Sequence, residues 1–284
     1  MQSDAQASSV TVNGLRLATR AIRNPAATET VYMLHGWLDN LASFEHLSGQ
    51  LSPLFNYVML DWPGHGLSDW NPGGYPITLY TQVLAELLTN EASPCHLIGH
   101  SMGAAACLMV AGCFPEQVKS AVLIDAIGPL TSPAGQACEN LRKAILGQRR
   151  AKPFRVYENE AIALQARLQS SPSITPDCML PLVRRGLQQQ SGGVQWRMDP
   201  ALRLPSIVRL SDDMADSFTA AIECQVLAIQ AINGLFEESL FDRRLREIKQ
   251  LKRIKLPGHH HLHMDPEYSA PVATAINDFL ESHQ

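Results

Sequence analysis

The clearest candidate for chemistry in the sequence is Ser101, which stands in the pentapeptide Gly-His-Ser-Met-Gly at 99–103. A short apolar run at 95–98 precedes it, and a run of small apolar residues follows it up to Phe114. The pattern predicts a strand, a tight turn and a buried helix, which is the setting in which a Gly-x-Ser-x-Gly motif exposes a nucleophilic serine. Glycines at both flanks leave room for the strained backbone of such a turn. We therefore expect Ser101 to act as a nucleophile at the amino end of a helix, where negative charge is favoured.

A serine hydroxyl needs a base within hydrogen-bonding reach, and a late loop offers four histidines. The loop follows a predicted strand at 252–256 and precedes a helix that starts at Pro266, with Asp265 as its cap. Clustered histidines can also bind a metal, but no carboxylate or cysteine cluster accompanies these in the sequence, so we expect no metal. Spacing alone does not choose the base. The four candidates are His259, His260, His261 and His263.

The acid that orients the base should lie between Ser101 and the histidine loop. Asp125 stands at the carboxyl end of a predicted strand at 121–124, although an aspartate there could also serve as a turn or helix cap. The other source is the exit of a predicted strand at 225–231, where Asn233 or Glu237 is the alternative. A buried carboxylate at either position could hold the imidazole tautomer and stabilise the imidazolium formed during attack.

Acyl transfer also requires two hydrogen-bond donors for the oxyanion of the tetrahedral intermediate. The turn itself supplies Met102 N–H, and the second donor should come from the loop at 35–37, where Gly36 allows close approach of the backbone. We expect Trp37, Met102, Trp62 and apolar residues of the later insertion to bind the substrate. Burial in the core explains Trp62 almost as well.

The elements that must position these residues alternate between strands and helices. A hairpin at 10–20, turning at Asn13-Gly14, opens the chain. The alternation then indicates a mostly parallel sheet, covered on both faces, with its site beyond the carboxyl ends of the strands. It stops over residues 129–221, where we expect helices and no strand, and resumes afterwards. We therefore predict a core of residues 1–128 and 222–284 with a helical cap inserted at 129–221.

Individual elements follow from the same periodicity. The expected strands are 30–34, 57–60, 95–98, 121–124, 225–231 and 252–256, and the expected helices are 43–51, 79–91, 102–114, 237–249 and 266–280.

Composition and charge narrow the class of protein. The 284 residues are 45% hydrophobic and 18% charged, which fits one large globular core. A net charge of -4 gives no reason to expect nucleic acid or an anionic membrane as partner, and a small neutral substrate fits better. We expect no secretory signal at the start, and the longest uncharged apolar stretch, 102–114, is too short to span a bilayer. Six widely spaced cysteines without a Cys-x-x-Cys motif favour a cytoplasmic location.

Five motifs carry a resemblance to a known family. They are HGWLDN at 35–40, DWPGHGLSD at 61–69, GHSMG at 99–103, LIDAIGP at 123–129 and PGHHHLHMDPE at 257–267. In this order they resemble the α/β-hydrolase superfamily, and within it the serine hydrolase-like, Kraken-type group, whose cap the segments at 184–187 and 196–202 also resemble. The resemblance implies an α/β fold with an eight-stranded, mostly parallel sheet, helices on both faces and a helical cap over the site; we expect no cofactor.

The resemblance also implies a role for each matching residue. It makes Ser101 the nucleophile and assigns the oxyanion donors to Trp37 and Met102. The His-x-x-His step before the last helix selects His260 as the base. The usual acid position, after the strand that follows the cap, is vacant here, and Asp125 matches the position of family members that carry the acid before the cap.

These roles predict a serine hydrolase that cleaves a carboxylic ester of a small or medium apolar substrate through an acyl-enzyme. Dehalogenases and epoxide hydrolases of the superfamily carry aspartate where Ser101 stands, so we expect acyl transfer to water. A carbon–carbon bond, a thioester or a lactone is the alternative substrate on the same triad. The vacant acid position also leaves open a binding protein of this fold with little activity.

Overall fold

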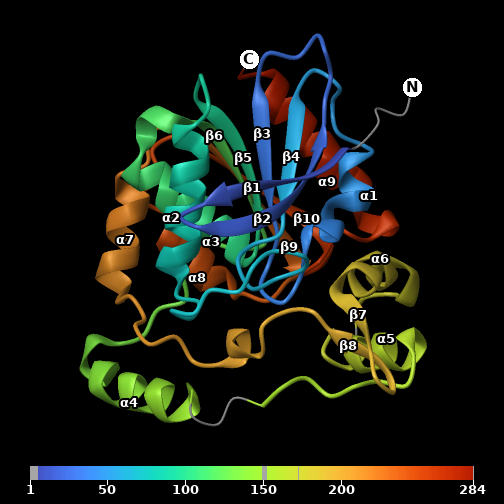
Figure 1. Cartoon of the computed structure of the whole chain (residues 1–284). Helices are drawn as coiled ribbons and strands as arrows, with labels where there is room; N and C mark the ends of the chain where they lie inside the picture. Colours follow the sequence, from blue (N-terminus) through green and yellow to red (C-terminus); the bar gives the residue numbers. More distant parts are fainter. Residues whose placement is uncertain (1–5, 149–151, 172, 284) are drawn as a thin grey trace.

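The computed structural model describes residues 6–148, 152–171 and 173–283 (Figure 1). These residues form one eight-stranded sheet in the order β1-β2-β4-β3-β5-β6-β9-β10. The six strands from β4 to β10 in this order run parallel, while β2 is antiparallel to both of its neighbours. The predicted mostly parallel sheet of eight strands is therefore confirmed. The strands are β1 (Gln6–Val12), β2 (Leu15–Ile22), β3 (Thr30–Leu34), β4 (Asn56–Leu60), β5 (Cys95–His100), β6 (Val118–Ile124), β9 (Gln225–Asn233) and β10 (Leu251–His259).

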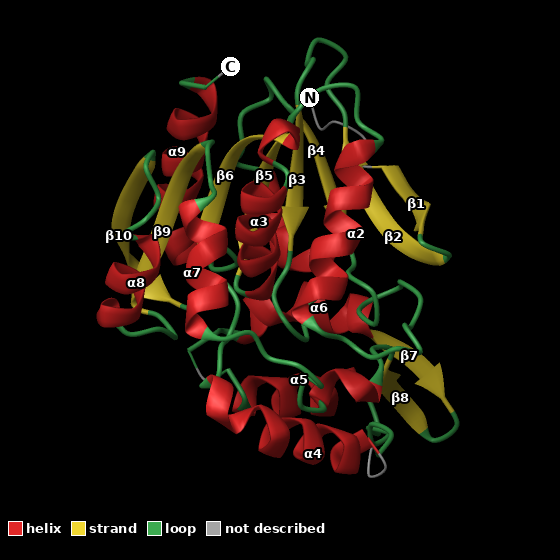
Figure 2. Ribbon diagram, turned by 90° about the vertical axis from the view of Figure 1, so that its left-hand side faces the viewer, coloured by secondary structure: helices red, strands yellow, loops and turns green. Residues whose placement is uncertain are grey.

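Helices cover both faces of this sheet (Figure 2). Successive strand side chains point to opposite faces, so that Leu97 belongs to the core under α2, α3 and α8, and Ile98 to the core under α1 and α9. Asp265 caps α9 by accepting a hydrogen bond from Glu267 N–H, as predicted. The expected helix at 43–51 is instead a short 3-10 turn, Leu41–Phe44, followed by one turn of α1. The covering helices are α1 (Glu45–Ser48), α2 (Ile77–Thr89), α3 (Met102–Cys113), α8 (Glu238–Leu245) and α9 (Pro266–Glu281).

The inserted segment forms a separate layer beside one end of the sheet (Figure 1). It contains α4 (Ala137–Gln148), α5 (Glu160–Gln169) and α6 (Pro176–Gly186). Buried residues of α5, of α6 and of the residues after α6 form a small core, which Met264 joins from the loop before α9. The inserted segment also contains an antiparallel hairpin, β7 (Leu187–Gln190) and β8 (Gly193–Trp196). The expectation of no strand over 129–221 is therefore wrong. The hairpin buries Val194 and Trp196, whereas Gln188 to Gln190 carry too little apolar character to mark a strand in the sequence.

The next helix, α7 (Asp212–Ala220), belongs to the layer on the sheet and not to the cap. Figure 2 shows it beside α3, and a carbon added to Gly112 of α3 would collide with Phe218 O. Arg244 of α8, almost fully buried, forms ion pairs with Asp212 and Asp216. Helix α7 therefore packs with the helices on the sheet, whereas the predicted division placed all residues up to 221 in the inserted segment.

Two buried ion pairs fasten the cap to the core. Arg167 of α5 donates to Asp39 Oδ1 at 2.9 Å, and Arg185 of α6 donates to Asp61 Oδ2 at 2.7 Å. Both carboxylates are at most 1% exposed. Removing either arginine would leave a buried carboxylate without its charged partner, which is strongly destabilising.

Among the described residues, no helix combines the length and the apolar character that a membrane crossing requires.

Candidate active site

Ser101 occupies the turn between β5 and α3. Its backbone has φ 52° and ψ -116°, a conformation that residues other than glycine rarely adopt. The flanking glycines make this turn possible. A carbon added to Gly103 would collide with Leu34 O, and one added to Gly99 would lie 2.5 Å from Ala104 N. The strand–turn–helix expected from the sequence is therefore present, with the serine at the amino end of α3.

His260 reaches Ser101 from the loop between β10 and α9. Its Nε2 lies 3.0 Å from Ser101 Oγ, and its Nδ1 lies 2.6 Å from Asp125 Oδ2. A proton on Nδ1 leaves the lone pair of Nε2 free to accept the serine proton. His100 Nε2 donates to the backbone carbonyl of His260 at 2.9 Å, which fixes the position of the loop. Among the four histidines of the loop, His260 is the one that the fold places against the serine.

Asp125 follows β6 directly and has a positive φ of 44°. Its carboxylate is fully buried and accepts the backbone N–H of Ala231 at 3.0 Å and of Leu235 at 3.1 Å. These two amides belong to the end of β9 and to the loop that follows it. Asp125 itself comes from the end of β6, so the neighbouring strand holds its carboxylate in place. The third hydrogen bond is the one from His260 Nδ1.

The two alternative acid positions lie elsewhere. Asn233 and Glu237 have exposed side chains, and Glu237 begins helix α8 as its cap residue. Neither forms a hydrogen bond with His260 among the described residues. Asp125 is therefore the group that can orient the imidazole.

The backbone around Ser101 also provides donors for an oxyanion. Met102 is the first residue of α3, so its N–H has no acceptor within the helix. Trp37 N–H makes no backbone hydrogen bond to a described residue. Its neighbour Gly36 lies against Ser101, because a carbon added there would be 3.1 Å from Ser101 Cβ.

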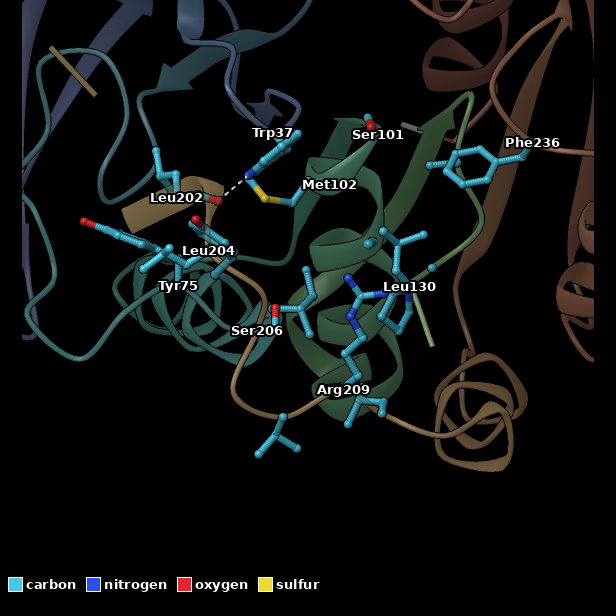
Figure 3. A pocket seen from close by; sticks show the side chains of 18 residues that line it. Trp37, Tyr75, Ser101, Met102, Leu130, Leu202, Leu204, Ser206, Arg209 and Phe236 are labelled. Atoms are coloured by element: carbon cyan, nitrogen blue, oxygen red, sulfur yellow. Dashed lines mark hydrogen bonds between the residues drawn. The ribbon is translucent and has the colours of Figure 1, made fainter. Parts of the chain in front are cut away.

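Ser101 and Trp37 stand between two cavities. The first, of about 200 Å³, extends below the serine, and its wall includes Leu202 and Leu204 from the cap (Figure 3). The indole of Trp37 lies at its edge, donating to Leu202 O at 3.0 Å. The second, of about 570 Å³, is bordered by the Arg167–Asp39 pair and by the histidine loop. A substrate with its carbonyl at Ser101 could therefore place one side in the first cavity and the other side in the second.

The fold matches that of a known protein family. The model of the alpha/beta hydrolase family matches residues 31–275, which is most of the chain. The chain belongs to the α/β-hydrolase family.

Relatives of this hydrolase refine that assignment. Serine hydrolase-like protein 2 of Homo sapiens is 31% identical over 280 residues, covering 88% of this chain and 86% of that protein. A serine hydrolase-like protein of Danio rerio is 28% identical, covering 90% and 83%. The crystal structure of a hypothetical protein from Pseudomonas aeruginosa PAO1 has a TM-score of 0.87 and 33% identity, covering 97% of this chain and 99% of that one. The expected resemblance to the serine hydrolase-like group is confirmed, and the relatives support hydrolytic activity.

One substrate-binding residue expected from the sequence does not belong to either cavity. Trp62 is fully buried, donates from Nε1 to His35 O at 3.0 Å, and packs edge-on against Tyr80. Trp62 therefore supports the loop at 35–37 through His35 and lines neither cavity.

Two further buried histidines belong to the same region. Burial lowers the pKa of His35, and burial with the neighbouring His35 ring lowers the pKa of His65 to about 3.

Sequence reasoning missed a second polar cluster in this hydrolase, beside the catalytic candidates. Asp39, from the loop after β3, lies between His100 at the end of β5 and His261 of the histidine loop. Burial opposes its ionisation, but His261 and Arg167 outweigh burial and hold the pKa of Asp39 well below its usual range. Burial lowers the pKa of His100 strongly and that of His261 as well. The Asp39-Asn40 step after an apolar strand marked a turn in the sequence, but nothing in the sequence pointed to its partners.

The other two histidines of the loop have separate surroundings. His259 Nε2 lies 3.3 Å from Asp265 Oδ2, next to the start of α9. His263 is fully buried, with its ring 5.3 Å from the ring of Phe44 and 4.2 Å from that of His100. Each of the four histidines therefore has different neighbours, which spacing in the sequence could not reveal.

Proposed function

We propose that this α/β-hydrolase is a serine hydrolase that cleaves carboxylic esters with a small or medium apolar acyl or alcohol group. The observation that carries the proposal is the continuous series of hydrogen bonds from Asp125 through His260 to Ser101 Oγ. A serine is a weak nucleophile by itself, and this series provides the base and the group that orients the base.

The first half of the reaction forms an acyl-enzyme. Ser101 Oγ attacks the ester carbonyl carbon while His260 Nε2 takes the hydroxyl proton, and the negative charge of Asp125 stabilises the imidazolium. The carbonyl oxygen becomes an oxyanion between the N–H groups of Trp37 and Met102; each such donor contributes about 100-fold to 1000-fold to turnover. The imidazolium then gives its proton to the leaving alkoxide, and the carbon–oxygen bond of the ester breaks.

The second half returns the free enzyme. Water loses a proton to His260 Nε2 as its oxygen attacks the acyl carbon, and the resulting tetrahedral intermediate expels Ser101 Oγ, which regains its proton from the imidazolium. The carboxylic acid product leaves through the cavity that held the acyl group. Every proton passes through the same nitrogen, so water is the one reactant besides the ester and His260 serves as both base and acid.

The two cavities support a substrate with unequal sides. The first cavity is walled by apolar cap and core side chains such as Leu202, Leu204 and Met102, and suits an alkyl or aryl group. The second cavity is larger and carries the Arg167–Asp39 pair together with serines of the cap, and suits a more polar part of the substrate. A small molecule is therefore the partner that we propose.

The test is a substrate panel with purified protein. Short p-nitrophenyl esters should give turnover that falls at longer acyl lengths, because the first cavity is small. Thioesters, lactones and β-diketones present the same carbonyl to Ser101 and belong in the panel, since faster turnover of one of these would replace the ester as the substrate class. No turnover with any member, in protein that is folded by circular dichroism, would refute the proposal.

We also propose the cytoplasm as the compartment, because the chemistry of the cysteines suits a reducing environment. All six thiols are free, and burial raises the pKa of Cys107 and brings that of Cys224 to about 11. Buried thiols of high pKa are poor partners for thiol exchange.

A further inference from the structure

The cluster of Asp39, His100 and His261 is not used in the proposed reaction, yet its three ligand atoms converge on one point. Asp39 Oδ2 lies 3.7 Å from His100 Nδ1 and 3.3 Å from His261 Nε2, and all three atoms lie within 4.8 Å of one another. Zinc-class ions bind imidazole nitrogen and carboxylate oxygen at about 2.0–2.2 Å in a tetrahedron, which separates neighbouring ligand atoms by about 3.3 Å. The two separations that involve Asp39 Oδ2 are close to that spacing.

Two of these atoms are buried without a partner. Among the described residues, Asp39 Oδ2 and His100 Nδ1 have no hydrogen bond, and the contact of Oδ2 with His261 does not have hydrogen-bond geometry. His100 Nε2 carries its proton, because it donates to the carbonyl of His260, so Nδ1 faces the carboxylate with a lone pair. Two electron-rich atoms that face each other in a buried site are unfavourable unless a cation lies between them.

The surroundings of the three ligands are those of a metal site. Histidines that bind metal usually donate their second N–H to a carbonyl or carboxylate, as His100 does to His260 O. Ligating carboxylates are themselves held by hydrogen bonds, and Arg167 Nη2 donates to the other oxygen of Asp39 at 2.9 Å. The ligands come from three separate segments, and each of the three residues borders the second cavity, which provides an entry path and room for a fourth ligand.

We propose that Asp39, His100 and His261 form a binding site for a divalent transition-metal ion of the zinc class, and that its occupancy slows hydrolysis. The ion takes Asp39 Oδ2, His100 Nδ1 and His261 Nε2 as ligands, with water from the second cavity in the fourth position. Ligation needs the lone pair of His261 Nε2, so the ring carries its one proton on Nδ1 when the ion is bound, and a proton held on Nε2 in the free protein passes to Nδ1 through solvent. No oxidation state changes on binding.

The inhibition follows from the position of His260. The His260 ring lies 4.7 Å from the ring of His100 and 5.1 Å from that of His261, centroid to centroid. During attack His260 becomes a cation, and an ion of charge +2 held by its two neighbours opposes that charge. The effect falls on kcat, because the charge on His260 develops in the transition state. Inhibition therefore rests on the proposed function, whereas binding does not.

The binding experiment uses metal-free full-length protein and Zn²⁺, with Co²⁺ as a spectroscopic probe. Wild type should bind one Zn²⁺ tightly by calorimetry, rise in Tm with it, and give the intense visible absorption of four-coordinate Co²⁺. Asp39→Asn and His261→Gln should each weaken Zn²⁺ binding by at least 10-fold. The controls are His46→Gln, at an exposed histidine of α1, and His259→Gln, in the same loop but outside the cluster; both should bind as wild type does.

Each result decides one part of the proposal. No stoichiometric binding by folded wild type, a six-coordinate Co²⁺ spectrum, or loss of binding in His259→Gln with retention in His261→Gln would overturn the site. Saturating Zn²⁺ should lower kcat at least 10-fold with little change in KM, and an unchanged kcat in the metal-bound enzyme would overturn the inhibition alone. If the panel of esters gives no turnover, binding and Co²⁺ absorption still test the site. If Asp39→Asn does not fold, zinc X-ray absorption of the wild type takes its place as the test. It should show two imidazole ligands.

Discussion

Replacing Asp125 by asparagine removes the charge from the proposed triad while keeping the shape of the side chain. Asparagine also tolerates the positive φ of 44° at this position, so the backbone can stay as it is. The carboxylate accepts three hydrogen bonds, from Ala231 N–H at Oδ1 and from Leu235 N–H and His260 Nδ1 at Oδ2. An amide has one acceptor oxygen and one NH₂ group, so it cannot satisfy this arrangement in either orientation.

Both orientations of the asparagine have a definite cost. With its oxygen toward His260, the amide NH₂ faces Ala231 N–H, and the imidazolium loses its negative partner. With its nitrogen toward His260, the ring must carry its proton on Nε2, where it can no longer accept from Ser101. We expect kcat to fall about 10⁴-fold, the size of this effect in a Ser-His-Asp triad. We also expect a loss of about 1–3 kcal/mol of stability from the backbone amide without an acceptor.

The assay compares kcat for the best ester of the panel in wild type, Asp125→Asn and Glu237→Gln, with urea unfolding of each. Glu237→Gln is the matched control, because it neutralises an exposed carboxylate after β9 that sequence reasoning left as an alternative acid; its kcat should stay within about twofold, as for surface substitutions away from the site. Asp125→Asn with kcat within 10-fold of wild type, or a large loss in Glu237→Gln, would refute the assignment of the acid.

Two further predictions concern stability. His65 is fully buried and its pKa in the folded protein is about 3, below the value of about 6.5 in an unfolded chain, so the unfolded state binds the extra proton as pH falls below 6.5. His65 alone should lower the free energy of unfolding by about 2 kcal/mol at pH 5 relative to pH 7.5, and buried His35 acts in the same direction. Urea midpoints that do not change between these pH values would contradict this prediction. Arg185→Met leaves the buried Asp61 carboxylate without its charged partner and should destabilise the protein by about 3–5 kcal/mol in the same measurement, whereas a loss below about 1 kcal/mol would show that the pair does not fasten the cap.

Local signals in the sequence were enough to predict the turn that carries Ser101 and the sheet. The turn around Ser101 is specified by its two glycines and by the strand and helix on either side, all within twenty residues. The hairpin at Asn13-Gly14 and the cap residue Asp265 are equally local, and the structure has all of them.

The base and the second polar cluster depend on contacts across the fold. Four histidines in five positions cannot be told apart by spacing, because the path of the loop after β10 decides which ring faces Ser101. The expectation of no metal rested on the lack of a nearby carboxylate in the sequence. Asp39 stands more than 200 residues before His261, and only the parallel arrangement of β3, β5 and β10 brings their carboxyl ends to the same edge.

The wrong expectations have physical reasons of a similar kind. Trp62 was expected near the substrate because its loop is, but its ring turns inward to His35. Helix α7 falls in the stretch where the alternation of strands and helices stops, and its periodicity cannot tell which surface it covers. The β7–β8 hairpin is short and rich in glutamine, so the sequence has no apolar alternation there. The two strands are recognised only by the hydrogen bonds between them.

The central claim is that His260 activates Ser101 for attack on a carbonyl or phosphoryl centre. The most direct test is the rate and site of labelling by a fluorophosphonate, measured by intact mass and peptide mapping in wild type, Ser101→Ala and His260→Ala. The arrangement predicts one adduct per chain on Ser101, none in Ser101→Ala, and labelling at least about 100-fold slower in His260→Ala, in line with the contribution of a general base. An adduct on another residue, or His260→Ala labelled at the wild-type rate, would contradict it.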